Sequence, residues 1–216
     1  MNPALIQRYK SVCENIPSHV TLVAVSKFQI VEAIQALYDS GQRVFGENRV
    51  QELIEKKPQL PDDLQWHCIG TLQTNKVKYI APFVSLIHSI DSLKLFEEVD
   101  KQAKKNNRVI DCLLEIFIAQ EESKHGLTEQ EAEQILAQQN SLSNVRIIGL
   151  MGMASNTDNK EQVRAEFKSL ASFYFRLCKL YKLSYLSMGM SGDYKIAIEE
   201  GSNMVRVGSS IFGTRM

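Results

Sequence analysis

The sequence predicts an α/β fold, a single (β/α)8 TIM-type barrel preceded by an N-terminal helix. Short apolar, β-branched runs alternate with longer segments of helical periodicity along the whole chain, a pattern typical of a parallel sheet covered by helices. There are eight such runs, and eight units favour a closed barrel over an open, doubly wound sheet. Glycines gather at the ends of these runs, where the loops of a barrel form its active face.

The predicted elements follow one another in regular order. A leading helix is expected over residues 3–14. The first strand, TLVAVS, covers residues 21–26, and a helix over 30–40 follows, because its apolar residues recur at helical spacing and Gly41 supplies a stop. By the same criteria, the remaining strands are predicted over residues 43–45, 65–70, 84–90, 109–119, 145–151, 185–188 and 204–208. The remaining helices are predicted over residues 48–57, 74–81, 92–106, 129–139, 159–181 and 193–201.

The composition is that of an ordinary globular protein. The 216 residues are 44% apolar and 23% charged, which is enough for one sizeable core, and no linker or repeat interrupts them, so residues 1–216 are interpreted as one domain. Lys and Arg together number 25, as do Asp and Glu. A net charge of zero gives no electrostatic reason to expect nucleic acid or a membrane surface as a partner. The even charge and the lack of an obvious apolar patch favour a monomer.

Cysteine and histidine usage indicates a reducing compartment and no metal site. No two cysteines form a C-x-x-C pair, so all are interpreted as free, buried thiols, and the four histidines are too scattered for a zinc site. No basic start precedes an apolar run, so no signal peptide is expected. The longest uncharged apolar stretch, around residues 80–90, is too short to span a bilayer. The protein is therefore expected in the cytoplasm.

Eight of the eleven glycines are expected at or just past the C-terminal ends of the predicted strands, where glycine allows a ligand to approach the backbone closely. These eight are Gly46, Gly70, Gly149, Gly152, Gly189, Gly192, Gly208 and Gly213.

Lys27 is the first candidate for chemistry. It directly follows the apolar run VAVS, so its amine is expected at the mouth of the barrel, where an unprotonated lysine can attack an aldehyde. From its position alone, a surface lysine at a strand end is the more frequent case.

Two turns rich in glycine and serine are candidates for a phosphate site. In SMGMSGDY (187–194), Ser191 stands near two glycines, and its hydroxyl and the neighbouring N–H groups can converge on an anion; a plain capped turn is the simpler alternative. In VRVGSSIFG (205–213), Gly208 and Ser209 follow the last strand. Barrels frequently hold phosphate in the loops after strands seven and eight, so the two turns are expected to form one phosphate cup.

Several polar residues lie near the same rim. Arg206, within the last strand, is expected to point inward and to hydrogen-bond a ligand nitrogen or an anionic oxygen; the alternative is a buried ion pair with a carboxylate such as Glu115. Asn48 and Asn75 follow the second and third strands. His67 lies inside an apolar strand, where a lone histidine is more often a satisfied core residue than a catalyst.

Seven segments carry a resemblance to a known family. They are AVSK (24–27), FGENRVQE (45–52), WHCIGTLQTNK (66–76), HSID (88–91), EESKHGL (121–127), GLMGMA (149–154) and, the longest, LSMGMSGDYKIAIEEGSNMVRVGSSIFGTR (186–215). Together they resemble the pyridoxal phosphate homeostasis protein family, whose fold is like the N-terminal barrel of alanine racemase. The resemblance covers nearly the whole chain.

The resemblance implies a pocket for pyridoxal 5′-phosphate (PLP) at the barrel mouth, with Lys27 as the lysine that forms a Schiff base with it. Arg206 would face the pyridine nitrogen, and because an arginine keeps its proton, that nitrogen stays unprotonated and the ring is a weaker electron sink. The residues implied to hold the phosphate are Ser191, Gly208 and Ser209. Those implied to line the rest of the pocket are Asn48 and Met188.

Two positions depart from the family pattern. Ile30 stands where the family commonly has a proline, three residues after the lysine, so the start of the following helix is expected to be less rigid. Phe117 stands where the fifth strand usually ends with an asparagine, so a polar contact from that strand beneath the cofactor is not expected.

The resemblance implies a non-catalytic carrier or regulator of PLP in vitamin B6 and amino-acid homeostasis, which hands the cofactor on through transient contact with apo-enzymes. The alternative is a PLP-dependent amino-acid racemase, which needs an acid–base group on each face of the amino acid. Lys27 can serve one face; in racemases a tyrosine from a second domain serves the other, and because the chain stops eight residues after Gly208, no such domain is expected. A third alternative is an aldolase-like enzyme acting on a sugar phosphate. Lys124, after the fifth strand, is the second lysine to examine.

Overall fold

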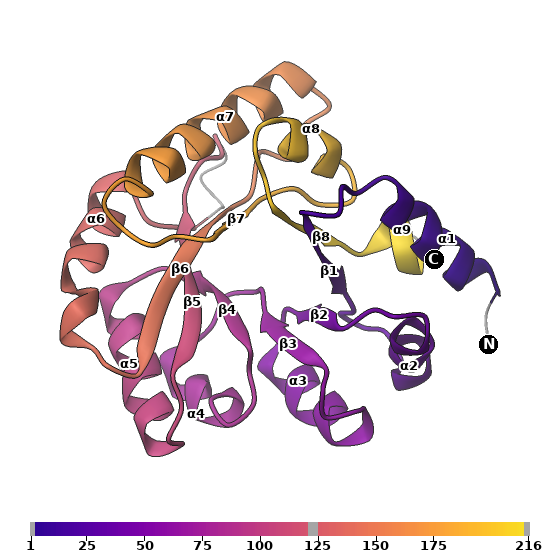
Figure 1. Ribbon diagram of the computed structural model, residues 1–216, viewed down its shortest axis with the longest axis horizontal. Coiled ribbons are helices and arrows are strands. Elements are labelled where there is room, and N and C mark those ends of the chain that lie inside the picture. Colours follow the sequence, from indigo (N-terminus) through magenta and orange to yellow (C-terminus); the bar gives the residue numbers. More distant parts are fainter. Residues whose placement is uncertain (1–2, 121–124, 214–216) are drawn as a thin grey trace.

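The computed structural model describes residues 3–120 and 125–213. Eight parallel strands form a closed barrel in which each strand pairs with the next along the chain and the last pairs with the first. The helices form an outer ring around the strands (Figure 1). The strands are β1 (Thr21–Val25), β2 (Val44–Glu47), β3 (Gln65–Cys68), β4 (Leu86–Ile90), β5 (Ile110–Ile116), β6 (Val145–Gly152), β7 (Tyr185–Ser187) and β8 (Met204–Val207). The predicted (β/α)8 fold class is therefore confirmed.

The helices follow the predicted order with one addition. The α-helices are α1 (Pro3–Glu14), α2 (Val31–Asp39), α3 (Val50–Lys56), α4 (Val77–Ile80), α5 (Leu93–Lys105), α6 (Glu129–Gln138), α7 (Lys160–Leu177), α8 (Tyr194–Glu199) and α9 (Ser209–Phe212). Three single-turn 3-10 helices accompany them, η1 (Lys57–Gln59), η2 (Thr74–Lys76) and η3 (Gln139–Ser141). The addition is α9, whose four residues are too few to show a helical period.

Several helices begin where their sequences supply a cap. Ser92 Oγ accepts from the N–H of Leu95 at the start of α5. Thr128 and Glu131 form a reciprocal capping box at the start of α6. Such caps satisfy backbone donors that have no partner within the helix, so they fix where each helix begins relative to the strand before it.

The barrel interior has an apolar layer below a more polar one. Side chains two residues apart on a strand point to the same side. The deeper layer is apolar and consists of Val23, Leu86, Leu113, Met151 and Met204. Two residues further along β4, β5 and β8 the buried side chains are His88, Glu115 and Arg206. The packed floor therefore closes the barrel from below, and polar groups collect toward its C-terminal mouth.

The C-terminal turn is fastened to the first helix. Figure 1 shows α1 and α9 beside each other, next to β1 and β8. Arg8 on α1 donates from Nε to the carbonyl of Ile211 (2.8 Å) and from Nη2 to the carbonyl of Phe212 (3.3 Å). The leading helix thus holds the turn that follows the last strand.

Two of the glycines predicted near strand ends lie elsewhere, Gly213 at the end of α9 and Gly149 within a strand. Gly149 is in the middle of β6, paired with Tyr185 of β7, because β6 continues to Gly152. A Cβ atom at Gly149 would lie 1.9 Å from the carbonyl oxygen of Tyr185. Glycine is required here by the close approach of two strands and not by a ligand.

The cysteines, the metal-ligand side chains and the helix lengths can each be compared with what the sequence predicts. All four cysteines are free; Cys68 and Cys112 are buried, whereas Cys13 and Cys178 are half-buried. Within residues 3–120 and 125–213, no three His, Cys, Asp or Glu side chains gather as a metal site would require. In the same ranges, no helix has the length and apolar character needed to cross a membrane.

Candidate functional site

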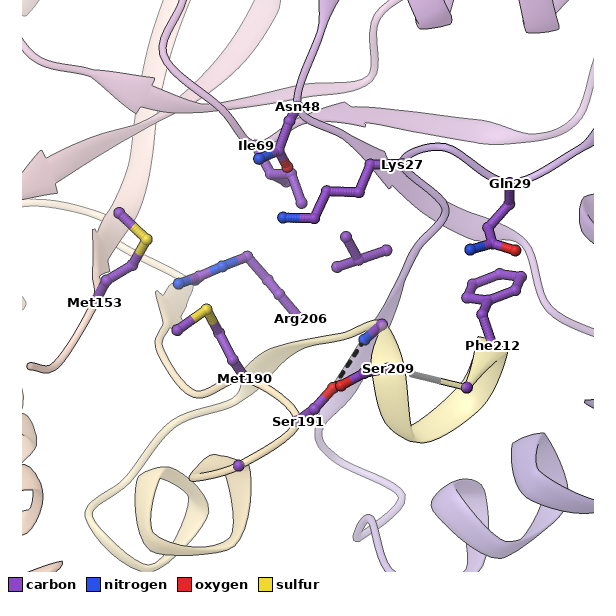
Figure 2. A pocket seen from close by; sticks show the side chains of 14 residues that line it. Lys27, Gln29, Asn48, Ile69, Met153, Met190, Ser191, Arg206, Ser209 and Phe212 are labelled. Atoms are coloured by element: carbon purple, nitrogen blue, oxygen red, sulfur yellow. Dashed lines mark hydrogen bonds between the residues drawn. The ribbon is translucent and has the colours of Figure 1, made fainter. Parts of the chain in front are cut away.

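A cavity of about 490 Å³ opens at the C-terminal mouth of the barrel, a volume within the usual range for small-molecule sites. Figure 2 shows side chains from widely separated parts of the chain reaching into it. Six of the predicted site residues line it together: Lys27, Asn48, Ser191, Arg206, Gly208 and Ser209. The strand ends of the barrel bring these residues into one place.

The seventh predicted site residue lies elsewhere. Met188 is fully buried and packs in the core outside the barrel. Met190 and Met153 line the cavity instead. Met153 was predictable, since it stands two residues after the inward-facing Met151. Met190 was not, because Gly189 has φ of 96°, and this left-handed turn breaks the alternation of the strand.

Lys27 presents a free amine to the cavity. It lies two residues past the end of β1, and its side chain extends between Asn48 and Arg206 (Figure 2). No side chain or backbone group in the described part of the protein forms a hydrogen bond or an ion pair with its Nζ. An amine without a protein partner is available to a ligand carbonyl.

The two glycine- and serine-rich turns are joined through Ser191. Its Oγ accepts from the backbone N–H of Gly208 (3.1 Å) and of Ser210 (3.3 Å), and the first of these bonds is drawn in Figure 2. Both lone pairs of the hydroxyl are then in use, so its hydrogen is left to donate. Ser209 lines the cavity beside it. The two turns are therefore joined as one unit, and the hydroxyl groups of Ser191 and Ser209 lie at the cavity.

Arg206 is held rigidly on the floor of the cavity. Its Nη1 donates to the carbonyl and the Oγ of Ser187 (2.8 and 2.6 Å), and Nη2 donates to the carbonyl of Gly152 (3.0 Å). None of these acceptors is a carboxylate, so the predicted alternative of an ion pair with Glu115 does not describe its contacts. Nε–H and one N–H of Nη2 have no acceptor among the described residues. Burial lowers the pKa of Arg206 to about 10, which leaves it charged at neutral pH.

A chain of buried hydrogen bonds continues from Arg206 across the barrel. Ser187 Oγ accepts from Arg206, so its own hydrogen can go to His88 Nδ1 (3.2 Å), and His88 Nε2 then donates to His67 Nδ1 (3.0 Å). Burial lowers the pKa of both histidines, that of His67 to about 3, so both are neutral at neutral pH. His67 is thus a hydrogen-bonded core residue outside the cavity lining.

Glu115 and Glu47 are buried carboxyl groups near the mouth of the barrel. Burial raises the pKa of each from about 4.5 to about 7; the charge of Arg206 opposes this rise at Glu115. A carboxyl whose pKa is higher in the folded state favours folding when it is protonated.

Replacing Glu115 by glutamine is expected to change how stability depends on pH. Protonation of Glu115 adds stability in full below pH 4.5, and the contribution is lost as pH rises to about 7. Between pH 4 and pH 8, the free energy of unfolding of the native protein should therefore fall relative to that of Glu115→Gln by about 3 kcal/mol. Urea unfolding at both pH values measures this difference. The exposed Glu32→Gln is the control, and parallel pH profiles for Glu115→Gln and the native protein would contradict the expectation.

The two departures from the family pattern lie away from the cavity floor. Ile30 precedes α2 as an N-cap without a side-chain hydrogen bond and is 66% exposed. Phe117 follows β5 and lines a groove on the outside of the barrel, between α6 and α7. Of the remaining rim residues, Asn75 is exposed, and Lys124 lies outside the described residues.

Comparisons with known proteins cover almost the full chain. The family model described as alanine racemase, N-terminal domain, matches residues 3–216. A pyridoxal phosphate homeostasis protein of Aquifex aeolicus is 41% identical, over 98% of this chain and 95% of that protein. Another from Vibrio alginolyticus is 38% identical, over 94% of this chain and 90% of that protein.

Two solved structures are similar to this chain over nearly its whole length. PipY of Synechococcus elongatus, solved with PLP bound, is 36% identical with a TM-score of 0.89, covering 97% of this chain and 100% of that chain. An alanine racemase of Clostridium difficile has a TM-score of 0.82 at 14% identity, covering 99% of this chain and 57% of that chain. The second likeness is one of fold alone.

Proposed function

The chain belongs to the pyridoxal phosphate homeostasis protein family, with the alanine racemase N-terminal domain, and we propose from this membership that it binds PLP as a Schiff base on Lys27. We propose further that it acts as a non-catalytic carrier or regulator of the cofactor. As one domain and a monomer in the cytoplasm, it passes PLP to apo-enzymes through transient contact. A relative with 36% identity was solved with PLP bound, which supports the choice of ligand.

The observation that carries this proposal is the arrangement of three unlike groups around one cavity. The Lys27 amine suits an aldehyde, the Ser191 cup supplies hydroxyl donors for a phosphate, and Arg206 has two unused N–H donors for a ring nitrogen. PLP carries an aldehyde, a phosphate and a ring nitrogen on one small ring. The residues present therefore fit the cofactor: Asn48 lies beside the lysine (Figure 2), and Ser209 and Gly208 line the same cavity with Ser191 and would hold the phosphate.

The lining of the cavity favours a carrier over a racemase. Racemisation needs an acid–base group on each face of the amino acid. Among the described residues that line the cavity, Lys27 carries the one amine; the others are amides, hydroxyls, apolar side chains, glycines and Arg206, so no second acid–base side chain faces it. The charged Arg206 also has no lone pair to take a proton from a ring nitrogen, so bound PLP is a weak electron sink. When bound, PLP supplies a reactive aldehyde, and this chain supplies the groups that hold it.

The direct test is an absorption spectrum of the purified protein with added PLP, followed by borohydride reduction and peptide mapping. We expect a Schiff-base band and a reduced adduct on the peptide that contains Lys27. No band and no adduct would overturn both the carrier and the racemase proposals. If the Schiff-base band is observed, racemisation of an added amino acid would favour the racemase.

A further inference from the structure

The two residues on either side of Lys27 are held by a buried cluster of charged side chains. The cluster consists of Glu47 at the end of β2 and Glu52 and Lys56 on α3. Glu47 is fully buried, and the side chains of Lys56 and Glu52 are 9% and 15% exposed. These residues lie outside the cavity lining, and none of them contacts the lysine amine.

The ammonium group of Lys56 joins the cluster to the chain before Lys27. Its Nζ donates to Glu47 Oε1 (2.8 Å), Glu52 Oε2 (2.8 Å) and the carbonyl of Ser26 (2.9 Å). An ammonium has three hydrogens, so each has one acceptor. Two of its three bonds are to carboxylates, and the third fixes the peptide unit that links Ser26 to Lys27.

The two carboxylates complete the clamp. Glu47 Oε1 accepts from Ser26 Oγ (2.7 Å), and Glu52 Oε2 accepts from the backbone N–H of Phe28 (2.6 Å). The Ser26 carbonyl also accepts from the N–H of Gln29 (3.0 Å). Both peptide units that include Lys27 are therefore bonded to one rigid cluster.

Phe28 shows why a clamp is needed. Its φ is +63°, in the left-handed region that costs a bulky L-residue free energy. Its ring is 49% exposed and lies against the guanidinium of Arg49, 5.0 Å from carbon to ring centroid. Core packing does not impose this conformation on a half-exposed ring. The bond from the Phe28 N–H to the Glu52 carboxylate, together with the turn bond from Gln29 N–H to the Ser26 carbonyl, holds this backbone conformation.

The cluster is costly to bury. Glu47 Oε2 and Glu52 Oε1 are buried with no hydrogen-bond partner among the described residues, and burial raises the pKa of Glu47 to about 7. Burial alone would raise the pKa of Glu52 as well, but the hydrogen bonds from Lys56 and Phe28 outweigh it and lower that pKa. Buried ion pairs with unsatisfied atoms contribute little net stability, so a role in geometry explains the cluster better than a role in stability.

We propose that Glu52, braced by Lys56 and Glu47, is a positioning residue: it holds the strained backbone of Phe28 next to Lys27, so that the lysine amine is aimed at the bound aldehyde. This inference rests on the proposed function of Lys27. In that step the amine nitrogen adds to the aldehyde carbon, the carbon–oxygen bond breaks, and the two amine hydrogens leave with the oxygen as water. The cluster touches none of these atoms and acts through the peptide units beside the lysine.

The test compares a covalent ligand with a non-covalent one in Glu52→Gln. PLP measures the rate of Schiff-base formation; 4′-deoxypyridoxine 5′-phosphate, which has a methyl group in place of the aldehyde, measures binding of the ring and phosphate alone. Glutamine gives Lys56 and the Phe28 N–H a neutral acceptor in place of a charged one, which should slow the covalent step by about tenfold, while the dissociation constant of the deoxy analogue changes by less than about twofold. Glu55→Gln, an exposed carboxylate on the same helix, is the matched control. An unchanged rate, or equal losses with both ligands, would overturn the proposal.

The variant Phe28→Gly distinguishes an effect of backbone strain at residue 28 from an unspecific effect of Glu52→Gln on the protein. Glycine enters the left-handed region without cost, so in a Phe28→Gly background the effect of Glu52→Gln should shrink below about threefold. A full tenfold effect in that background would overturn the strain argument. If the native protein forms no adduct at all, the proposed function fails by itself, and the clamp is then judged from amide exchange. Glu52→Gln should speed exchange of the Phe28 N–H by about tenfold, and unchanged exchange would overturn the clamp.

Discussion

Replacing Lys27 by alanine is expected to abolish covalent attachment of PLP and to leave the fold intact. The amine is the proposed nucleophile, and no other amine lines the cavity among the described residues. The side chain has no hydrogen-bond or ion-pair partner in the described part of the chain, so its removal should change the free energy of unfolding by no more than about 0.5 kcal/mol. Borohydride trapping with mass spectrometry measures the first quantity, and thermal unfolding measures the second.

The matched control is Lys76→Ala, which removes an exposed lysine of the loop after β3. It should keep the adduct at the native level. Should Lys27→Ala still yield a reduced adduct, another lysine forms the Schiff base, and Lys124 is the first to map. Retained non-covalent binding by Lys27→Ala is expected, because the phosphate cup and Arg206 remain.

Replacing Gly149 by alanine is expected to have the largest effect on stability. The new Cβ would lie 1.9 Å from the Tyr185 carbonyl oxygen and 2.8 Å from its carbonyl carbon, and these backbone atoms belong to the ladder between β6 and β7. The strands must separate, at a cost of about 3 kcal/mol or more. For a chain of this size, this lowers Tm by roughly 6–12 °C, as calorimetry would show.

Gly192→Ala is the control for Gly149→Ala. No atom lies within 4 Å of a Cβ atom built at Gly192, and Gly192 is not among the glycines with positive φ. Its Tm should stay within about 2 °C of the native value. Equal Tm values for Gly149→Ala and the native protein would mean that β6 and β7 can separate locally without loss of stability.

Most of the fold could be predicted from the sequence, because each βα unit of a barrel appears as a short apolar run followed by a segment of helical periodicity. The strand TLVAVS was predicted over 21–26 and is observed as Thr21–Val25. The largest error at a strand end was after β5, predicted to reach residue 119. It ends at Ile116 because Phe117 N–H donates to the carbonyl of Leu127, which turns the backbone away from the barrel. The acceptor stands ten residues further along the chain, just before α6, so the bond is not visible in the local apolar pattern.

The site was predictable where it depends on strand ends and not where it depends on backbone conformation. The places of Lys27 just after β1 and of Arg206 on β8 could be predicted from the two apolar runs. The left-handed conformation of Phe28 could not be predicted, because a phenylalanine does not favour it. The role of Lys56 was also missed. It ends an ordinary amphipathic helix, and its partners Ser26 and Glu47 are recognisable only after the strands have been placed.

The pairing of β1 with β8 has a consequence for when the site can exist. These strands are the first and the last of the barrel to be synthesised, and they meet from Thr21 beside Met204 to Ala24 beside Val207. A growing chain carries Lys27 early but has no phosphate cup until the residues after β8 have emerged. A ligand that spans this seam binds the closed barrel and not the open one, so by mass action it adds RT ln(1 + [L]/Kd) to the stability of closure. The proposed binding of PLP would therefore stabilise the closed barrel in newly made protein.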